Sequence, residues 1–171
     1  GDHFHGAHQL SGWLLPQLAV ANFINIVSVM VVTDVARLVG AFDTPVKWLE
    51  DWLAWIRVAH SHEIGYIDEC LSSYRIHDGS SARDNTGYQF SREAVYQIVL
   101  SEYGSVLSPD VLSKVHYERG SNLLEMGDAR TARSSFVSAL KRRHLHWRSA
   151  AKLLASYLSP SCARHLRGAF K

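Results

Sequence analysis

Two adjacent carboxylates, Glu50 and Asp51, are the residues of this sequence best placed for acid–base chemistry. They stand in a predicted helix over 46–59, where Asp51 falls in the first turns and the helix dipole favours its ionised form. An ionised carboxylate within hydrogen-bond reach of a hydroxyl group can act as a general base. Acids at the start of a helix also serve simply to complement the dipole, and the pair alone does not choose between these roles.

Three histidines, His3, His5 and His8, form a second group with chemical potential. Imidazoles are good metal ligands. No carboxylate or cysteine is spaced to complete a ligand set with them, so incidental histidines are the simpler interpretation.

Residues 1–86 carry the pattern of an α/β segment. Residues 26–32 form a β-branched run that predicts a buried strand, apolar on both faces and therefore central in a sheet. The helix over 46–59 places Leu49, Trp52, Leu53 and Ile56 on one stripe. The remaining predicted elements are helices at 6–21 and 34–39, strands at 64–67 and 71–76, and loops at 41–45 and 78–86.

Residues 87–171 predict helices only, over about 90–103, 109–125, 129–142, 146–157 and 160–169. Ser108-Pro109-Asp110 is a typical helix start, with a capping serine, proline in the first turn and an acid near the dipole. One stretch is similar to a single tetratricopeptide repeat, although a plain helical hairpin explains it equally well. The small and aromatic residues of that stretch are Gly120, Gly127, Ala132, Phe136 and Ala139.

The composition is that of a folded protein, because 47% of the 171 residues are apolar and 20% are charged. The net charge of +2 does not indicate nucleic-acid binding. Cys70 and Cys162 are too few and too far apart for a disulfide framework or a cysteine-based metal site. The apolar stretch 14–32 contains too many polar residues for a membrane span.

Four short patterns occur in the order and spacing of a known family. They are the strand with its Val39-Gly40-Ala41-Phe42-Asp43 loop, Glu50-Asp51-Trp52 opening a helix, Tyr74-Arg75-Ile76-His77 at a strand end, and the serine-rich loop with Ser80 and Ser81. Together they resemble the C-terminal half of a family 2 glycosyltransferase of the GT-A type, over about residues 20–82. Ala41 departs from the second glycine of that family's loop.

The resemblance implies a partial GT-A-like mixed sheet in residues 1–86, the acceptor side of the domain, followed by the helical tail 87–171. It implies inverting transfer of a sugar from a nucleotide-sugar to a glycan or lipid-linked acceptor, with Asp51 as the general base and Glu50 beside it. It further implies substrate contacts from Trp52, Arg75, His77, Ser80 and Ser81. Trp48 and Trp55 are alternatives for stacking on the acceptor, and core packing is the plainer role for both.

The resemblance also implies a divalent metal, manganese or magnesium, with His77 as a ligand or a diphosphate contact. No Asp-x-Asp sequence, the family's metal motif, occurs in the chain. We therefore expect a separate N-terminal nucleotide-binding half, and no activity from this chain alone. The expected location is cytoplasmic, with at most peripheral contact with the membrane. The alternative function is a non-enzymatic helical protein-interaction module.

Overall fold

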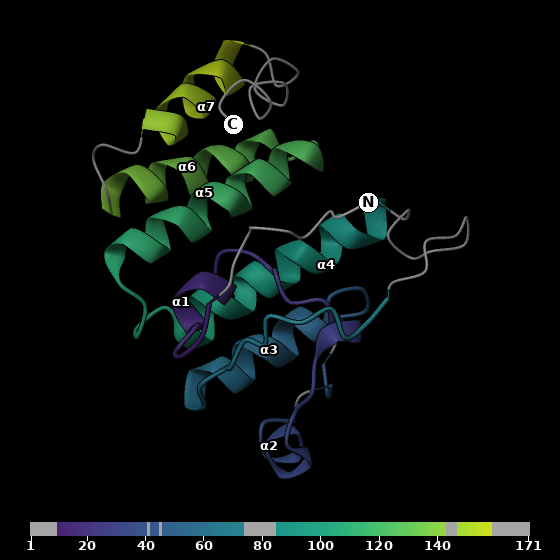
Figure 1. The fold of residues 1–171 in the computed structure, drawn as a ribbon. Helices are drawn as coiled ribbons and strands as arrows, with labels where there is room; N and C mark the ends of the chain where they lie inside the picture. The colour runs from purple at the N-terminus through teal and green to yellow at the C-terminus, as the bar shows by residue number, and fades with distance from the viewer. Residues whose placement is uncertain (1–9, 41, 45, 74–84, 143–146, 159–171) are drawn as a thin grey trace. The chain divides into compact units, whose positions relative to one another are not determined.

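The computed structural model describes residues 10–40, 42–44, 46–73, 85–142 and 147–158 (Figure 1). The chain divides into two compact units, Gly1–Arg83 and Asp84–Lys171.

The described residues form helices and no sheet, so the predicted α/β fold with a partial mixed sheet is wrong. In the first unit the helical elements are α1 (Leu15–Leu18), the 3₁₀ turn η1 (Ile26–Ser28), α2 (Thr33–Leu38) and α3 (Glu50–Ser61). In the second unit they are α4 (Asn85–Ile98), the π-helical turn η3 (Val99–Tyr103), α5 (Pro109–Glu125), α6 (Ala129–Arg142) and α7 (Trp147–Leu158).

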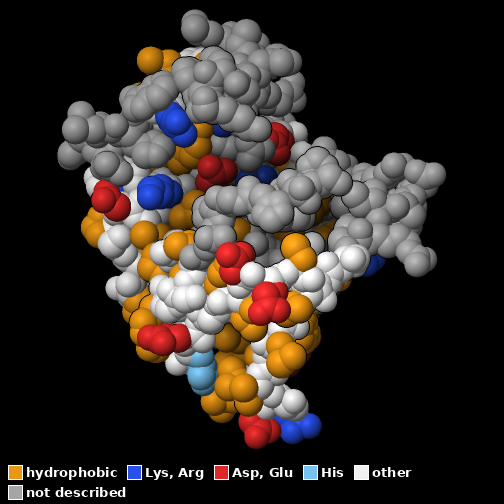
Figure 2. All heavy atoms as spheres, viewed as in Figure 1, with side chains coloured by type: hydrophobic (Ala, Val, Ile, Leu, Met, Phe, Trp, Pro, Cys, Tyr) orange, Lys and Arg blue, Asp and Glu red, His pale blue; other side chains and the backbone are white. Residues whose placement is uncertain are grey.

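The predicted strand over 26–32 begins instead as the turn η1. The Asn25 side chain accepts a hydrogen bond from the backbone N–H of Val27 at 3.2 Å, and the Asn25 carbonyl accepts one from Ser28 N at 3.0 Å. This local bonding competes with strand pairing. Met30 is 99% exposed and Val32 is 68% exposed, so the run is not the buried central strand that its composition predicts. Hydrophobic side chains lie at the surface around α2 in Figure 2.

The predicted strands over 64–67 and 71–76 are also wrong where the structure describes them. The only strand-like pairing in the described part of the chain is an antiparallel bridge in which Gly12 N donates to Ile64 O at 2.8 Å and Ile64 N donates to Gly12 O at 3.0 Å. Ile67 and Leu71 are exposed, so no second layer covers them. Residues 74–76 lie outside the described part of the chain.

The core of the first unit is built on α3. Its predicted stripe is buried as expected, with Trp52, Leu53 and Ile56 each at most 2% exposed. The helix begins at Glu50, four residues later than predicted, and α1 packs against it. In the described residues the predicted helix over 6–21 forms only as Leu15–Leu18. Pro16 lies in the first turn of this short helix, where its missing N–H breaks no helical hydrogen bond.

The described residues of the second unit are helical as predicted, and the helix predicted over 160–169 lies outside them. Ser108 caps α5, its hydroxyl accepting a hydrogen bond from Val111 N at 3.4 Å. Helices α5 and α6 pack closely, because a Cβ atom at Gly120 would lie 2.7 Å from a ring carbon of Phe136. Gly127, with a φ of +87°, closes the turn between the two helices in a backbone region that favours glycine.

Candidate functional site

The N-terminus of α3 brings two carboxylates together. Leu49 precedes the helix as a buried residue without a side-chain cap, and Glu50 and Asp51 fill the first turn. The backbone N–H groups of a first turn have no helical partners, so they and the dipole favour negative charge at this place. The predicted position of the two acids within a helix is therefore confirmed.

Asp51 is half-buried and holds two hydrogen bonds with different oxygens. Its Oδ1 accepts from the backbone N–H of Trp52 at 2.7 Å, and its Oδ2 accepts from Asn22 Nδ2 at 3.4 Å. Burial raises the pKa of Asp51 above its usual value, with a smaller contribution from the charge of Glu50. The two hydrogen bonds oppose this effect, because they stabilise the ionised form.

Glu50 and Trp55 each present an unsatisfied polar atom. Glu50 Oε2 and Trp55 Nε1 are buried, and neither has a hydrogen-bond partner among the described residues. Trp55 also packs edge-on against Phe42, with ring centroids 6.1 Å apart. A buried polar group without a partner lowers the stability of the fold. These two buried atoms of α3 could therefore each form a further hydrogen bond.

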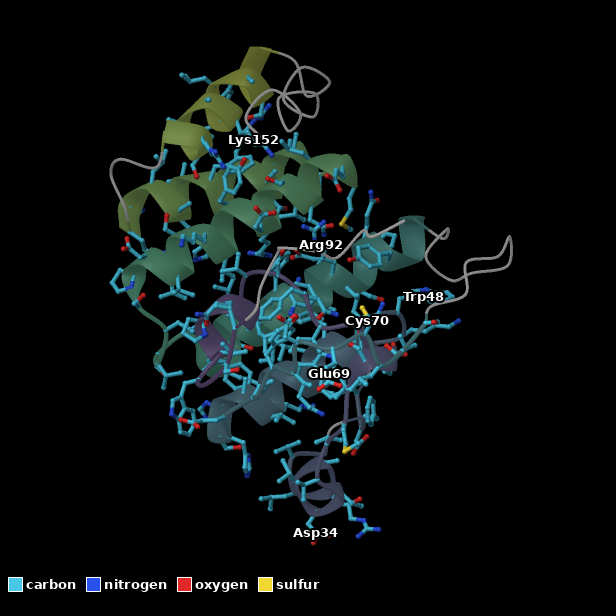
Figure 3. The ribbon with its side chains drawn as sticks, viewed as in Figure 1. Asp34, Trp48, Glu69, Cys70, Arg92 and Lys152 are labelled. Atoms are coloured by element: carbon cyan, nitrogen blue, oxygen red, sulfur yellow. The ribbon has the colours of Figure 1, made fainter. Side chains whose placement is uncertain are left out.

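Trp52 lies in the core, 2% exposed, and its indole N–H donates to the carbonyl of Leu18 at 2.7 Å. This bond ties α1 to α3, and the substrate contact expected of Trp52 stays a prediction. Trp48 is half-buried, with the ammonium group of Lys47 5.4 Å from its ring centroid. The Trp48 side chain is labelled in Figure 3, among the side chains of the first unit.

Arg57 holds the loop that precedes α3. Its guanidinium donates to the carbonyls of Gly40 and Asp43, the second at 2.8 Å. Gly40 has a φ of +55°, and Asp43 N donates to its carbonyl at 3.0 Å, so the loop turns sharply after α2. The Gly-x-Phe-Asp loop is thus fixed to the same helix that carries Asp51.

The other predicted site residues lie outside the part of the chain that the structure describes. They are Arg75, His77, Ser80 and Ser81, together with His3, His5 and His8. Among the described residues no three histidine, cysteine or carboxylate side chains lie close enough to hold a metal ion. The divalent metal and its His77 ligand therefore stay predictions. Cys70 is a free, exposed thiol, and Cys162 is outside the described residues.

Sequence reasoning missed Asn22, which contacts Asp51 although 29 positions separate them. An asparagine that bonds its own backbone two residues later, as Asn22 does with Ile24, is a recognisable local signal. Nothing local indicates the distant carboxylate, because that contact depends on how α1 packs against α3.

The second unit buries several polar side chains between its helices. Arg119 of α5 donates to Glu93 Oε1 of α4 at 2.6 and 2.8 Å. Lys152 of α7, labelled in Figure 3, is 2% exposed and donates to Ser121 Oγ at 2.7 Å, with its ammonium 4.9 Å from the centroid of the Tyr117 ring. These contacts fix the register of the helices without bringing together a set of groups suited to catalysis.

His116 is a further buried group, 8% exposed, and neither ring nitrogen has a partner among the described residues. Burial, helped by the charges of Arg142 and Arg119, lowers its pKa from 6.5 to about 4. The folded protein therefore binds fewer protons here than the unfolded chain. The contribution of the neutral His116 ring to the free energy of unfolding is fully present above pH 6.5 and is lost as the pH falls towards 4.

We expect the titration of His116 to lower the free energy of unfolding by about 2 kcal/mol as the pH falls from 7 to 4.5. His116→Leu removes the titrating ring and should make the unfolding free energy less dependent on pH by that amount. Urea unfolding at the two pH values measures it, with His60→Gln, an exposed residue, as the control. Equal pH dependence in His116→Leu and the wild-type protein would contradict the expectation.

Comparisons with models of protein families, with curated protein sequences and with solved structures find no match. Within the described residues no helix has the length and hydrophobicity to cross a membrane.

Proposed function

We propose that this chain supplies the acceptor-side catalytic base of an inverting sugar transfer from a nucleotide-sugar, and that Asp51 is that base. The observation that supports the proposal is the setting of Asp51. It is half-buried at the start of α3, with one oxygen bonded to backbone and the other to an amide, within the sequence Glu50-Asp51-Trp52.

In the proposed reaction a hydroxyl group of the acceptor sits within hydrogen-bond reach of Asp51. Its oxygen attacks the anomeric carbon of the donor as its proton passes to the Asp51 carboxylate. The bond from that carbon to the phosphate oxygen breaks, and the nucleoside diphosphate leaves with the bonding electron pair from the opposite face. The configuration of the sugar is therefore inverted, through a transition state that resembles an oxocarbenium ion.

Burial suits this task. A carboxylate whose pKa is raised by burial is a stronger base than an exposed one, provided that it remains ionised at the working pH. The two hydrogen bonds to Asp51 favour the ionised form. Burial and the hydrogen bonds thus act in opposite directions on one carboxylate, which is the balance that a general base needs.

The remaining partners are also proposals. The donor is a nucleotide-sugar, the acceptor is a glycan or a lipid-linked glycan, and a separate nucleotide-binding half contributes the Asp-x-Asp sequence that this chain lacks. The described residues offer no ligand set for a divalent metal, and the proton transfer proposed for Asp51 does not involve one.

Release of nucleoside diphosphate tests the proposal without knowledge of the sugar linkage. The protein to be tested is the complete one, in which this chain is joined to or paired with a nucleotide-binding half. When it is incubated with a panel of nucleotide-sugars and with glycan and lipid acceptors, it should release UDP or GDP from one of these donors. The isolated chain should release none. An upstream coding sequence without Asp-x-Asp, together with no release from any donor, would overturn the proposal.

A non-enzymatic helical interaction module is the second candidate. The observation that favours it is the close packing of α5 and α6 at Gly120 and Phe136, the spacing that a tetratricopeptide-like hairpin requires. Stable arrays of such repeats need about three units, and the described residues contain one hairpin followed by α7. The outcome that overturns the enzyme proposal would favour this module.

A further inference from the structure

Asn22 is oriented by its own backbone. Its side-chain Oδ1 accepts a hydrogen bond from the N–H of Ile24 at 3.2 Å. This bond occupies the oxygen of the amide, so the NH₂ end is the one that faces Asp51, where Nδ2 lies 3.4 Å from Oδ2. The direction of the donor is therefore set before any substrate arrives.

The segment that carries Asn22 is anchored to the same helix turn as Asp51. Four residues before Asn22, the carbonyl of Leu18 accepts the buried indole hydrogen bond of Trp52, at 2.7 Å. Leu18 and Ala19 are fully buried, and α1 packs against α3. Because Trp52 is adjacent to Asp51, this anchor fixes the distance between the Asn22 segment and the start of α3.

The two oxygens of Asp51 are therefore not equivalent. Oδ1 is held by the backbone N–H of Trp52 at 2.7 Å, and Oδ2 is held more loosely by Asn22. With both bonds made, the carboxyl plane is fixed. Without Asn22, only the bond from the adjacent N–H remains, and the carboxyl group can turn about its χ2 torsion, which has a broad energy profile.

We propose that Asn22 is a positioning residue that fixes the orientation of the Asp51 carboxylate for accepting the acceptor proton. This role rests on the proposed function of Asp51. In this role Asn22 acts on the reaction through its hydrogen bond to Asp51 Oδ2 rather than through contact with the donor or the acceptor. Its loss should lower the rate of proton transfer more than the binding of substrate.

The first measurement is the titration of the Asp51 carboxyl carbon by NMR in the 171-residue chain, which needs no substrate. Asn22→Ala should raise the pKa of Asp51, because burial and Glu50 then act against one donor fewer. Asn22→Asp keeps the size and the bond to Ile24 N, and it should raise that pKa further by placing a second carboxylate against the first. A pKa of Asp51 that is the same in both variants as in the wild-type chain overturns the proposal.

Asn25→Ala is the matched control, because Asn25 makes the same kind of local bond, to Val27 N, in the same loop, and none to Asp51 among the described residues. It should leave the titration of Asp51 unchanged. A shift as large as that in Asn22→Ala would assign the effect to general loosening of the loop and overturn the proposal.

The second measurement is the pH profile of transfer in the complete enzyme. In Asn22→Ala the acidic limb should move to higher pH and kcat should fall between about 10- and 100-fold, with KM little changed. An unchanged profile in an enzyme that depends on Asp51 overturns the role of Asn22 alone. A wild-type enzyme that transfers no sugar from any donor overturns the proposed function, and the positioning role falls with it even if the NMR titration shifts.

Discussion

Asp51→Asn is expected to lower transfer by about 10²- to 10⁴-fold, the range found for groups that act in acid–base catalysis. The substitution keeps the size and planarity of the side chain and removes its basicity. Its amide oxygen can still accept the 2.7 Å hydrogen bond from Trp52 N, so the start of α3 should form as before. The loss should appear in kcat and in kcat/KM equally, because the base acts only in the transition state.

Asp34→Asn is the matched control for this substitution. Asp34 is another acid in the first turn of a helix of the same unit, and its side chain is 90% exposed and paired only with Arg37 at 3.3 Å among the described residues (Figure 3). Removing its charge should leave transfer within a few-fold of wild type. If Asp51→Asn also transfers sugar within a few-fold of wild type, and circular dichroism shows that both variants are folded, the assignment of Asp51 as the base is contradicted.

The helices could be predicted because their signals are local. Apolar residues recur at helical spacing in α3, and Ser108-Pro109 marks the start of α5 with a cap that the structure contains. The position of Asp51 in a first turn could be predicted for the same reason. An error of a few residues arose at Val46, whose N–H bonds to Thr44 Oγ1 before α3 begins. The helix predicted over 6–21 was a larger error, since the described residues contain only Leu15–Leu18 of it.

The strand predictions were wrong, because a strand depends on partners elsewhere in the chain. A β-branched run such as 26–32 favours extended backbone, but it forms a sheet only where another strand supplies hydrogen bonds. The local bond from Val27 N to the Asn25 side chain competes with that pairing, and Met30 and Val32 remain exposed. The contact between Asn22 and Asp51 was missed for a related reason, since it joins two segments through tertiary packing.

The second unit offers a prediction of similar size, on the packing of α5 against α6. Phe136 is fully buried and contacts Tyr117, with ring centroids 6.1 Å apart. Phe136→Ala leaves a cavity in this cluster and should lower the free energy of unfolding by about 3–5 kcal/mol. Urea unfolding followed by circular dichroism measures the loss, with Val137→Ala, a more exposed neighbour on α6, as the control that should cost much less.

A double-mutant cycle with Gly120 identifies the cause. Gly120→Ala places a Cβ atom 2.7 Å from a ring carbon of Phe136, so it should destabilise the wild-type protein although alanine is the better helix former. In the Phe136→Ala background the ring is gone, and the same substitution should instead stabilise by up to about 1 kcal/mol. Gly127→Ala, which meets no neighbouring atom but has a φ of +87°, should destabilise equally in both backgrounds. If Gly120→Ala has the same effect with and without the Phe136 ring, the close packing of α5 and α6 does not depend on this contact, and the resemblance to a repeat hairpin loses its structural basis.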